Sequence, residues 1–187
     1  PNDIFLGNTQ ATGRAFLSRV FNVISLDYDR LVIPCVGKFA MAEAAKTSLN
    51  WKMEKLETSD ISLFSTLVGF HITEQDIGNL KVMLHEGDKE PVQLFDAPES
   101  LYQQKLGIME RTAKTYHMKL YVEDLIARKD DHKEKLLKGL DTLKDKLSGL
   151  SYEARDLTEH FESAIDDPKA VIWLAPPLLT GDYAKMF

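Results

Sequence analysis

Leu31-Val-Ile-Pro-Cys-Val-Gly37 is the stretch that decides the fold of this chain. A continuous apolar run is typical of a strand buried on both faces, as the strands of parallel sheets are. The run ends at a glycine, which permits a tight turn with close backbone approach. Residues 39–48, which follow, are rich in helix formers. Strand, turn and helix in this order predict the first unit of a nucleotide-binding α/β fold.

Asp60 extends this prediction to a second strand. Residues 52–58 lead into Asp60 and predict a short strand that ends near it. In nucleotide-binding α/β folds, an acidic residue about 20 positions after the glycine turn accepts hydrogen bonds from ribose hydroxyls. The interval from Gly37 to Asp60 agrees with this spacing. Asp60 could instead cap a helix predicted at residues 61–70, and one carboxylate can do both.

Residues 14–21 form the first predicted helix, because their apolar residues share one helical face. Asn8 or Thr9, in the polar loop before it, would cap this helix. The free N–H groups at such an end attract a carboxylate. An ordinary helix packed on a sheet explains the same pattern, so both interpretations stay open.

The middle of the chain is predicted to be helical, with residues 100–126 as one continuous helix and residues 128–146 as another. Leucines in and after the second helix recur at spacings of three and four: Leu136, Leu140, Leu143, Leu147 and Leu150. This pattern favours a solvated helix that packs along one apolar stripe. The alternative is a projecting helical hairpin that meets a partner or DNA through Lys133, Lys135, Lys138, Lys144 and Lys146.

Short elements are predicted after the helical middle. Residues 151–156 are strand-like and end in an acidic residue, and residues 157–164 predict a short helix. Residues 170–174 predict a second buried strand. This strand runs into Ala175-Pro-Pro-Leu178, where two prolines stop any helix or ladder and force an extended, rigid loop.

Composition excludes several classes of protein. The apolar fraction of 44% and the charged fraction of 28% are those of an ordinary globular protein. No run of about 18 apolar residues is present to span a membrane, and no signal-peptide pattern opens the chain. A single cysteine, Cys35, excludes an internal disulfide and predicts a reducing, cytoplasmic location. The net charge of −6 argues against coating nucleic acid over the whole surface, although a local basic patch can still bind it.

Metal and hydrolase sites are not predicted. The five histidines lie far apart, without the spacing of metal ligands. No Gly-x-Ser-x-Gly motif is present. Cys35 has no nearby histidine to activate it, so a small packed residue is favoured over a nucleophile.

Taken together, these segments resemble the class I S-adenosylmethionine-dependent methyltransferases that act on amino groups of DNA bases. They are most similar to the small DNA methylase proteins of bacteriophages. The resemblance covers residues 5–70 and 151–187 and leaves the helical middle unexplained. It implies an α/β fold with a Rossmann-like methyltransferase sheet and a helical insertion. The implied division is a cofactor-binding half (1–96), the insertion (97–150) and the remainder of the core (151–187).

The resemblance assigns cofactor-binding roles to two segments of the first half. Asn8 and Thr9, with the helix after them, resemble the motif that binds the carboxylate of S-adenosylmethionine. The turn around the methionine moiety reads Phe-x-Gly-x-Gly in the family, although Lys38 and Phe39 replace the second small residue here. The residues similar to that turn are Pro34, Cys35, Val36 and Gly37.

Two acidic segments complete the implied cofactor site. Ser59, Asp60 and Ile61 resemble the acidic strand end that holds the ribose hydroxyls. Arg155 and Asp156 resemble the third motif of the family, whose Asp contacts the adenine amino group of the cofactor.

The catalytic motif carries the sharpest likeness and the largest departure. The family reads Asp/Asn-Pro-Pro-Tyr/Phe after a buried strand, where this chain has Ala175, Pro176, Pro177 and Leu178. In the family the Asp or Asn accepts hydrogen bonds from the amino group of the flipped base and polarises its nitrogen toward the methyl donor. A methyl group at Ala175 accepts no hydrogen bond, and Leu178 replaces the stacking ring. Tyr183, in a stretch similar to the Gly-Gly-Tyr-Glu-Lys-Met-Phe of the phage proteins, is the candidate substitute for that ring.

Two functions follow from the resemblance. The first is a methyltransferase that moves a methyl group from S-adenosylmethionine to an exocyclic amine of a DNA base, with adenine favoured. The second is a methyltransferase-fold module that binds without catalysis, as an interaction or decoy module in phage–host conflict. It is motivated by Ala175, because losing one polarising group typically costs orders of magnitude in rate. Because a fold does not determine function, a third hypothesis is a nucleotide-binding domain with different chemistry.

DNA is therefore the expected partner, and the host cytoplasm the expected location if a phage encodes the chain. Resembling enzymes need further strands to complete their sheet and a segment that reads the target bases. We expect either more sequence beyond Phe187 or an additional chain that completes the fold.

Overall fold

Four short parallel strands form the centre of the fold. The computed structural model describes residues 11–46, 55–80, 94 and 96–174. The described strands are β1 (Arg30–Pro34), β2 (Leu56–Ser59), β3 (Ser151–Glu153) and β4 (Ala170–Ile172). They form one sheet in the order β3-β2-β1-β4. The predicted Rossmann-like α/β class is confirmed.

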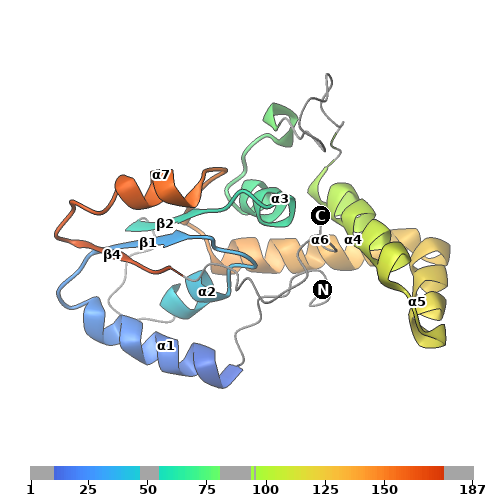
Figure 1. Cartoon of the computed structure of the whole chain (residues 1–187), viewed down its shortest axis with the longest axis horizontal. Coiled ribbons are helices and arrows are strands. Elements are labelled where there is room, and N and C mark those ends of the chain that lie inside the picture. The colour runs from blue at the N-terminus through green and yellow to red at the C-terminus, as the bar shows by residue number, and fades with distance from the viewer. Residues whose placement is uncertain (1–10, 47–54, 81–93, 95, 175–187) are drawn as a thin grey trace.

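Seven α-helices and one short 3₁₀ helix accompany the sheet in the described part of the chain. They are α1 (Ala11–Ile24), α2 (Ala40–Lys46), α3 (Leu63–Ile72), η2 (Ile77–Asn79), α4 (Ala97–Thr112), α5 (Tyr116–Ala127), α6 (Lys129–Lys146) and α7 (Leu157–Glu162). Figure 1 shows α7 on one face of the sheet and α1 and α2 on the other. The helices α4, α5 and α6 extend to one side, with α5 farthest from the sheet.

The central strand β1 is buried as its apolar sequence predicts. Leu31, Val32 and Ile33 are all 0% exposed. Pairing with β2 runs in register from Leu31 opposite Leu56 to Pro34 opposite Ser59. On the other side β4 pairs with the first half of β1, and Trp173 N–H extends the ladder by donating to the carbonyl of Val32 at 2.8 Å.

Two predicted boundaries differ from the observed ones for local reasons. The first strand ends at Pro34 rather than Val36, because Cys35 takes a left-handed backbone with a φ of 61°, which cannot continue a strand. The helix predicted throughout 100–126 is broken into α4 and α5. Thr115 has an extended backbone and its hydroxyl accepts a hydrogen bond from the N–H of Met118, so it starts a new helix.

The helix α6 packs on the body along its leucines, as the favoured interpretation predicts. Leu140 and Leu147 are buried in the core, and so is Leu150 just after the helix. Leu136 and Leu143 are partly buried against the same core. The helical middle is therefore joined to the α/β part through a common apolar core.

The remaining strands are shorter or less buried than their sequences predict. The strand predicted at 151–156 ends at Glu153, because Asp156 instead caps α7. The strand β4 is only half-buried, since the described residues place it at the edge of the sheet. Trp173, directly after it, packs edge-on against Phe21 of α1 at 5.6 Å between ring centres.

Candidate cofactor site at the carboxyl edge of the sheet

The carboxyl ends of all four strands meet at one edge of the sheet, because the strands are parallel. The chain places β2 and β3 on one side of β1 and β4 on the other. In open α/β sheets, ligands bind outside the carboxyl ends of the strands where the order reverses in this way. The predicted cofactor segments that follow β1, β2 and β3 therefore all lie along the edge where the topology places a ligand.

The turn after β1 has an unusual backbone. Cys35, Gly37 and Phe39 have φ values of 61°, 58° and 65°, so every second residue is left-handed. Glycine adopts this conformation freely, but a side chain there costs about 1–2 kcal/mol. Such strain concentrates at ligand clamps and active sites. Gly37 and Phe39 thus share a left-handed backbone, although only Gly37 lacks a side chain.

Asp60 ties this turn to the end of β2. Its Oδ2 accepts a hydrogen bond from the N–H of Gly37 at 2.9 Å. Its Oδ1 accepts one from the N–H of Ser62 at 2.8 Å, in the turn that starts α3. The capping residue of α3 is Ser62, whose hydroxyl accepts from the N–H of Ser65, so the predicted capping role belongs to Ser62 rather than Asp60. Asp60 instead holds two loops of the edge together.

Asp60 still has acceptor capacity for a ligand. A carboxylate offers about four lone-pair sites, and the two backbone N–H groups use two of them. The next residue, Ile61, is 71% exposed, so a large aliphatic side chain stands in solvent beside the acid. A carboxylate next to an exposed aliphatic group suits a ligand with hydroxyls and an apolar ring, which is the chemistry of a nucleoside.

Cys35 lies in the electrostatic field of two predicted site residues. Burial, together with the nearby carboxylates of Asp60 and Asp156, raises the pKa of the Cys35 thiol to about 11. The thiol is therefore protonated at neutral pH, which counts against a nucleophile. The parallel pairing of β1 with β2 and of β2 with β3 places the ends of β1 and β2 and the loop after β3 along one edge. Asp156 is exposed and caps α7 through an N–H of Thr158 at 2.8 Å.

Tyr152 supports the site from β3, a role that no pattern in the sequence indicated. Its hydroxyl donates to the carbonyl of Asp60 at 2.8 Å and lies 3.0 Å from Thr66 Oγ1. Its ring lies 5.8 Å from that of Phe39. Burial raises its pKa, so the hydroxyl stays protonated and able to donate. Since Asp60 and Tyr152 are 92 residues apart, no local pattern could have indicated this contact.

His160 is a second supporting residue that sequence reasoning missed. It is 3% exposed, and its Nδ1 lies 2.6 Å from Ser59 Oγ at the end of β2. The carbonyl of Ser59 in turn accepts from the N–H of Val36 at 3.0 Å. The helix α7 is thus connected through Ser59 to the turn after β1. Both the serine and the histidine are buried, so the pair is a packing contact and not a hydrolase site.

Several predicted site residues lie outside the described residues. These are Asn8 and Thr9 of the first motif and Ala175, Pro176, Pro177, Leu178 and Tyr183 of the catalytic motif. In the sequence, Ala175 follows the end of β4 by three positions.

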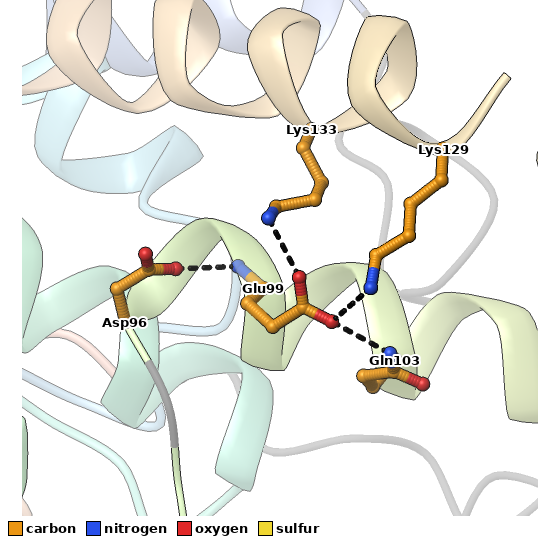
Figure 2. A pocket seen from close by; sticks show the side chains of 5 residues that line it. All are labelled: Asp96, Glu99, Gln103, Lys129 and Lys133. Atoms are coloured by element: carbon orange, nitrogen blue, oxygen red, sulfur yellow. Dashed lines mark hydrogen bonds and ion pairs between the residues drawn. The ribbon is translucent and has the colours of Figure 1, made fainter.

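A surface depression of about 550 Å³ between α4 and α6 is lined by a second cluster of polar side chains (Figure 2). The Glu99 carboxylate accepts from Lys129 at 2.8 Å, Lys133 at 2.7 Å and Gln103 at 2.6 Å. Asp96 caps α4 by accepting from the N–H of Glu99 at 2.7 Å. The contacts from Lys129 and Lys133 to Glu99 tie α6 to α4.

In the described ranges, no helix is both long and apolar enough to cross a membrane. The four-stranded parallel sheet with its helices makes the chain a Rossmann-like α/β protein. A sequence model of the family described as phage DNA adenine methylase-like domain 1 matches residues 5–187. The chain therefore belongs to this family, as its resemblance to phage DNA methylases predicts, and the match also includes the helical middle.

Membership supports a DNA methylase-like function and implies an S-adenosylmethionine-dependent methylase. No curated protein and no solved structure matches the chain significantly.

Proposed function

We propose that the chain binds S-adenosylmethionine at the carboxyl edge of its sheet and transfers the methyl group to the exocyclic amine of adenine in DNA. The observation that carries the proposal is the hydrogen bond between Gly37 and Asp60, which joins the strained turn to the acidic strand end. Family membership supports the reaction class and DNA as the substrate. In this proposal residues 1–96 and 151–187 supply the cofactor site and the catalytic motif, and residues 97–150 are a helical insertion.

The residues of the edge have distinct roles in this proposal. S-adenosylmethionine, when bound, supplies an electrophilic methyl group on sulfur. Asp60 accepts hydrogen bonds from the ribose hydroxyls, and Ile61 packs against the purine. Asp156 accepts from the purine amino group. Asn8 and Thr9 hold the carboxylate of the cofactor, and Pro34, Cys35, Val36 and Gly37 surround its methionine moiety.

Cofactor binding is tested by calorimetry with S-adenosylmethionine and its demethylated product on the full chain. We expect binding in the wild type and a loss of at least about tenfold in Asp60→Ala, which equals about 1.4 kcal/mol. Asp76→Ala is the matched control, because Asp76 also accepts from a backbone N–H, that of Gly78 in η2, at 2.9 Å. Folded protein that binds neither ligand would overturn the proposal, as would equal losses in the two variants.

A second candidate function, binding without catalysis, is favoured by Ala175, since its methyl group cannot accept a hydrogen bond from a target amine. Ala175→Asp and Ala175→Asn restore an acceptor at that position. If the rest of the catalytic motif is intact, we expect either variant to raise methyl transfer to DNA, measured with tritiated S-adenosylmethionine. Retained cofactor binding with no gain in transfer would favour the binding module. Ala175→Leu is the matched control, because it adds volume without an acceptor.

A further inference from the structure

The turn between α4 and α5 carries three cations with no acidic residue among them, although Glu110 and Glu123 flank the stretch. We call residues 111–120 the α4–α5 tip. No Asp or Glu occurs between Glu110 and Glu123, whereas both signs alternate along α6. Figure 1 shows that α5, which starts in this tip, is the helix farthest from the sheet. The cations of the tip are Arg111, Lys114 and Lys119, and all three are exposed.

An aromatic side chain stands in solvent beside these cations. Tyr116 is 71% exposed, and its ring lies 5.9 Å from that of His117, which is also exposed. Leu120, one turn further along α5, is 41% exposed. Tyr116 and Leu120 are four residues apart, so they lie on the same exposed face of α5.

The other cations of the helical middle are largely used inside the molecule. Lys144 pairs with Glu74 at 2.6 Å and Lys146 with Glu43 at 3.1 Å. Lys129 and Lys133 both pair with Glu99 (Figure 2). Among the residues that the structure describes, no ion pair involves a cation of the α4–α5 tip. Three of the five lysines of the alternative hairpin hypothesis are therefore paired. In the described part of the chain, Lys135 and Lys138 of α6 are exposed and in no ion pair, as are the three cations of the tip.

We propose that the α4–α5 tip contacts the sugar–phosphate backbone of duplex DNA and positions it for the site at the sheet edge. The choice of DNA rests on the proposed function, and the location rests on unpaired cations beside an exposed ring. Basic residues that contact phosphates fix the register of a protein on DNA without reading its sequence. Tyr116 adds an aromatic face for contact with sugars or splayed bases, as in other nucleic-acid-binding surfaces.

The test measures binding of the full chain to a fluorescein-labelled DNA duplex over a series of KCl concentrations. The tip variant is Arg111→Gln/Lys114→Gln/Lys119→Gln. We expect it to weaken binding and to reduce the slope of log K against log [KCl] by roughly one for each phosphate contact removed. Tyr116→Ala is expected to weaken binding at an unchanged slope, and Tyr116→Phe to restore it.

The matched control removes the same charge from the sheet region. It is Arg19→Gln/Lys55→Gln/Lys169→Gln, at positions on α1 or just before β2 and β4. We expect its slope to stay near that of the wild type. Equal changes in the tip and control variants would show that net charge alone matters and would overturn the proposal. So would wild-type affinity in the tip variant, the result expected if the tip docks a protein.

Calorimetry with S-adenosylmethionine on the same variants separates this inference from the proposed function. A tip variant that binds the cofactor normally but has a reduced salt slope supports the inference. If no variant binds the cofactor but the tip still sets the salt slope, the methyltransferase proposal fails and the DNA surface stands.

Discussion

Gly69 occupies the position where α3 packs directly on the ring of Tyr152. A Cβ at Gly69 would lie 2.4 Å from Tyr152 Cγ. The ring cannot move aside easily, since its hydroxyl bonds to Asp60 and Thr66. We expect Gly69→Ala to lower the free energy of unfolding by about 1–3 kcal/mol, the usual cost of overpacking. Urea denaturation followed by circular dichroism measures this change.

Gly139 provides the matched control for that substitution. A Cβ there meets nothing within 4 Å, and Gly139 lies inside α6. Gly139→Ala is expected to raise the free energy of unfolding by about 0.5–1 kcal/mol, because glycine carries an entropic cost in helices. Destabilisation of similar size in both variants would show that the ring of Tyr152 is not the cause.

His160 gives the fold a predictable response to acid. Burial lowers its pKa below the usual 6.5, and the Arg155 cation lowers it further, while Glu57 acts in the opposite direction. The unfolded chain therefore takes up a proton at this position at a higher pH than the folded chain does. The contribution of His160 to the free energy of unfolding is constant well above about pH 6.5. Below that value the free energy of unfolding falls as the pH decreases.

The measurement for His160 is the free energy of unfolding across this pH range. We expect His160→Gln to be less stable than the wild type at neutral pH. Its free energy of unfolding should decrease less on acidification than that of the wild type, because an amide does not titrate. His117→Gln is the control, since that side chain is exposed. A decline in His160→Gln as steep as in the wild type would assign the response to other groups.

At the scale of elements, Glu99 joins α4 to α6. Hydrogen bonds from Lys129, Lys133 and Gln103 lower the pKa of Glu99 to about 2. A carboxylate whose pKa is lower in the folded chain than in the unfolded chain stabilises the fold at pH values above its pKa in the unfolded chain. This stabilisation is lost as the pH falls toward the pKa in the folded chain. We expect Glu99→Gln to cost about 1 kcal/mol at neutral pH, since partly exposed ion pairs are weak.

The pH dependence identifies the cause of that loss. The difference in unfolding free energy between the wild type and Glu99→Gln should shrink as the pH falls from about 4.5 toward about 2, where the wild-type carboxyl is also neutral. Glu110→Gln, at an exposed position of the same helix, is the control and should change little at any pH. A constant difference over this range would point to lost packing instead of lost charge.

Elements with a strong local pattern could be predicted, and those set by neighbours could not. The apolar run of β1 and the leucines of α6 each specify a buried face, and both were found as predicted. The break between α4 and α5 was missed because Thr115 acts through one side-chain hydrogen bond. The proximity of Gly37 and Asp60 followed from spacing, since they come directly after neighbouring parallel strands. Tyr152 and His160 act through distant contacts, which leave no local pattern.

For the molecule as a whole, Leu140 connects the helical middle to the α/β part. It is 6% exposed and belongs to the same core as β1 and β2, whereas Leu137 on the same helix is 41% exposed. Removing a buried leucine side chain costs about 2–5 kcal/mol, and an exposed one typically less than about 0.5 kcal/mol. We therefore expect Leu140→Ala to be much less stable than Leu137→Ala.

Hydrogen exchange of the two leucine variants tests whether the molecule unfolds as one unit. Because α6 contributes to the common core, Leu140→Ala should reduce the protection of α4 and α6 and of the strands β1 and β2 together. Leu137→Ala should leave both regions near the wild-type level. Loss of protection in α4 and α6 with full protection of β1 and β2 would mean that residues 97–150 form an independently unfolding insertion. Since the shared leucine core joins the two parts, a single cooperative loss is the expected result.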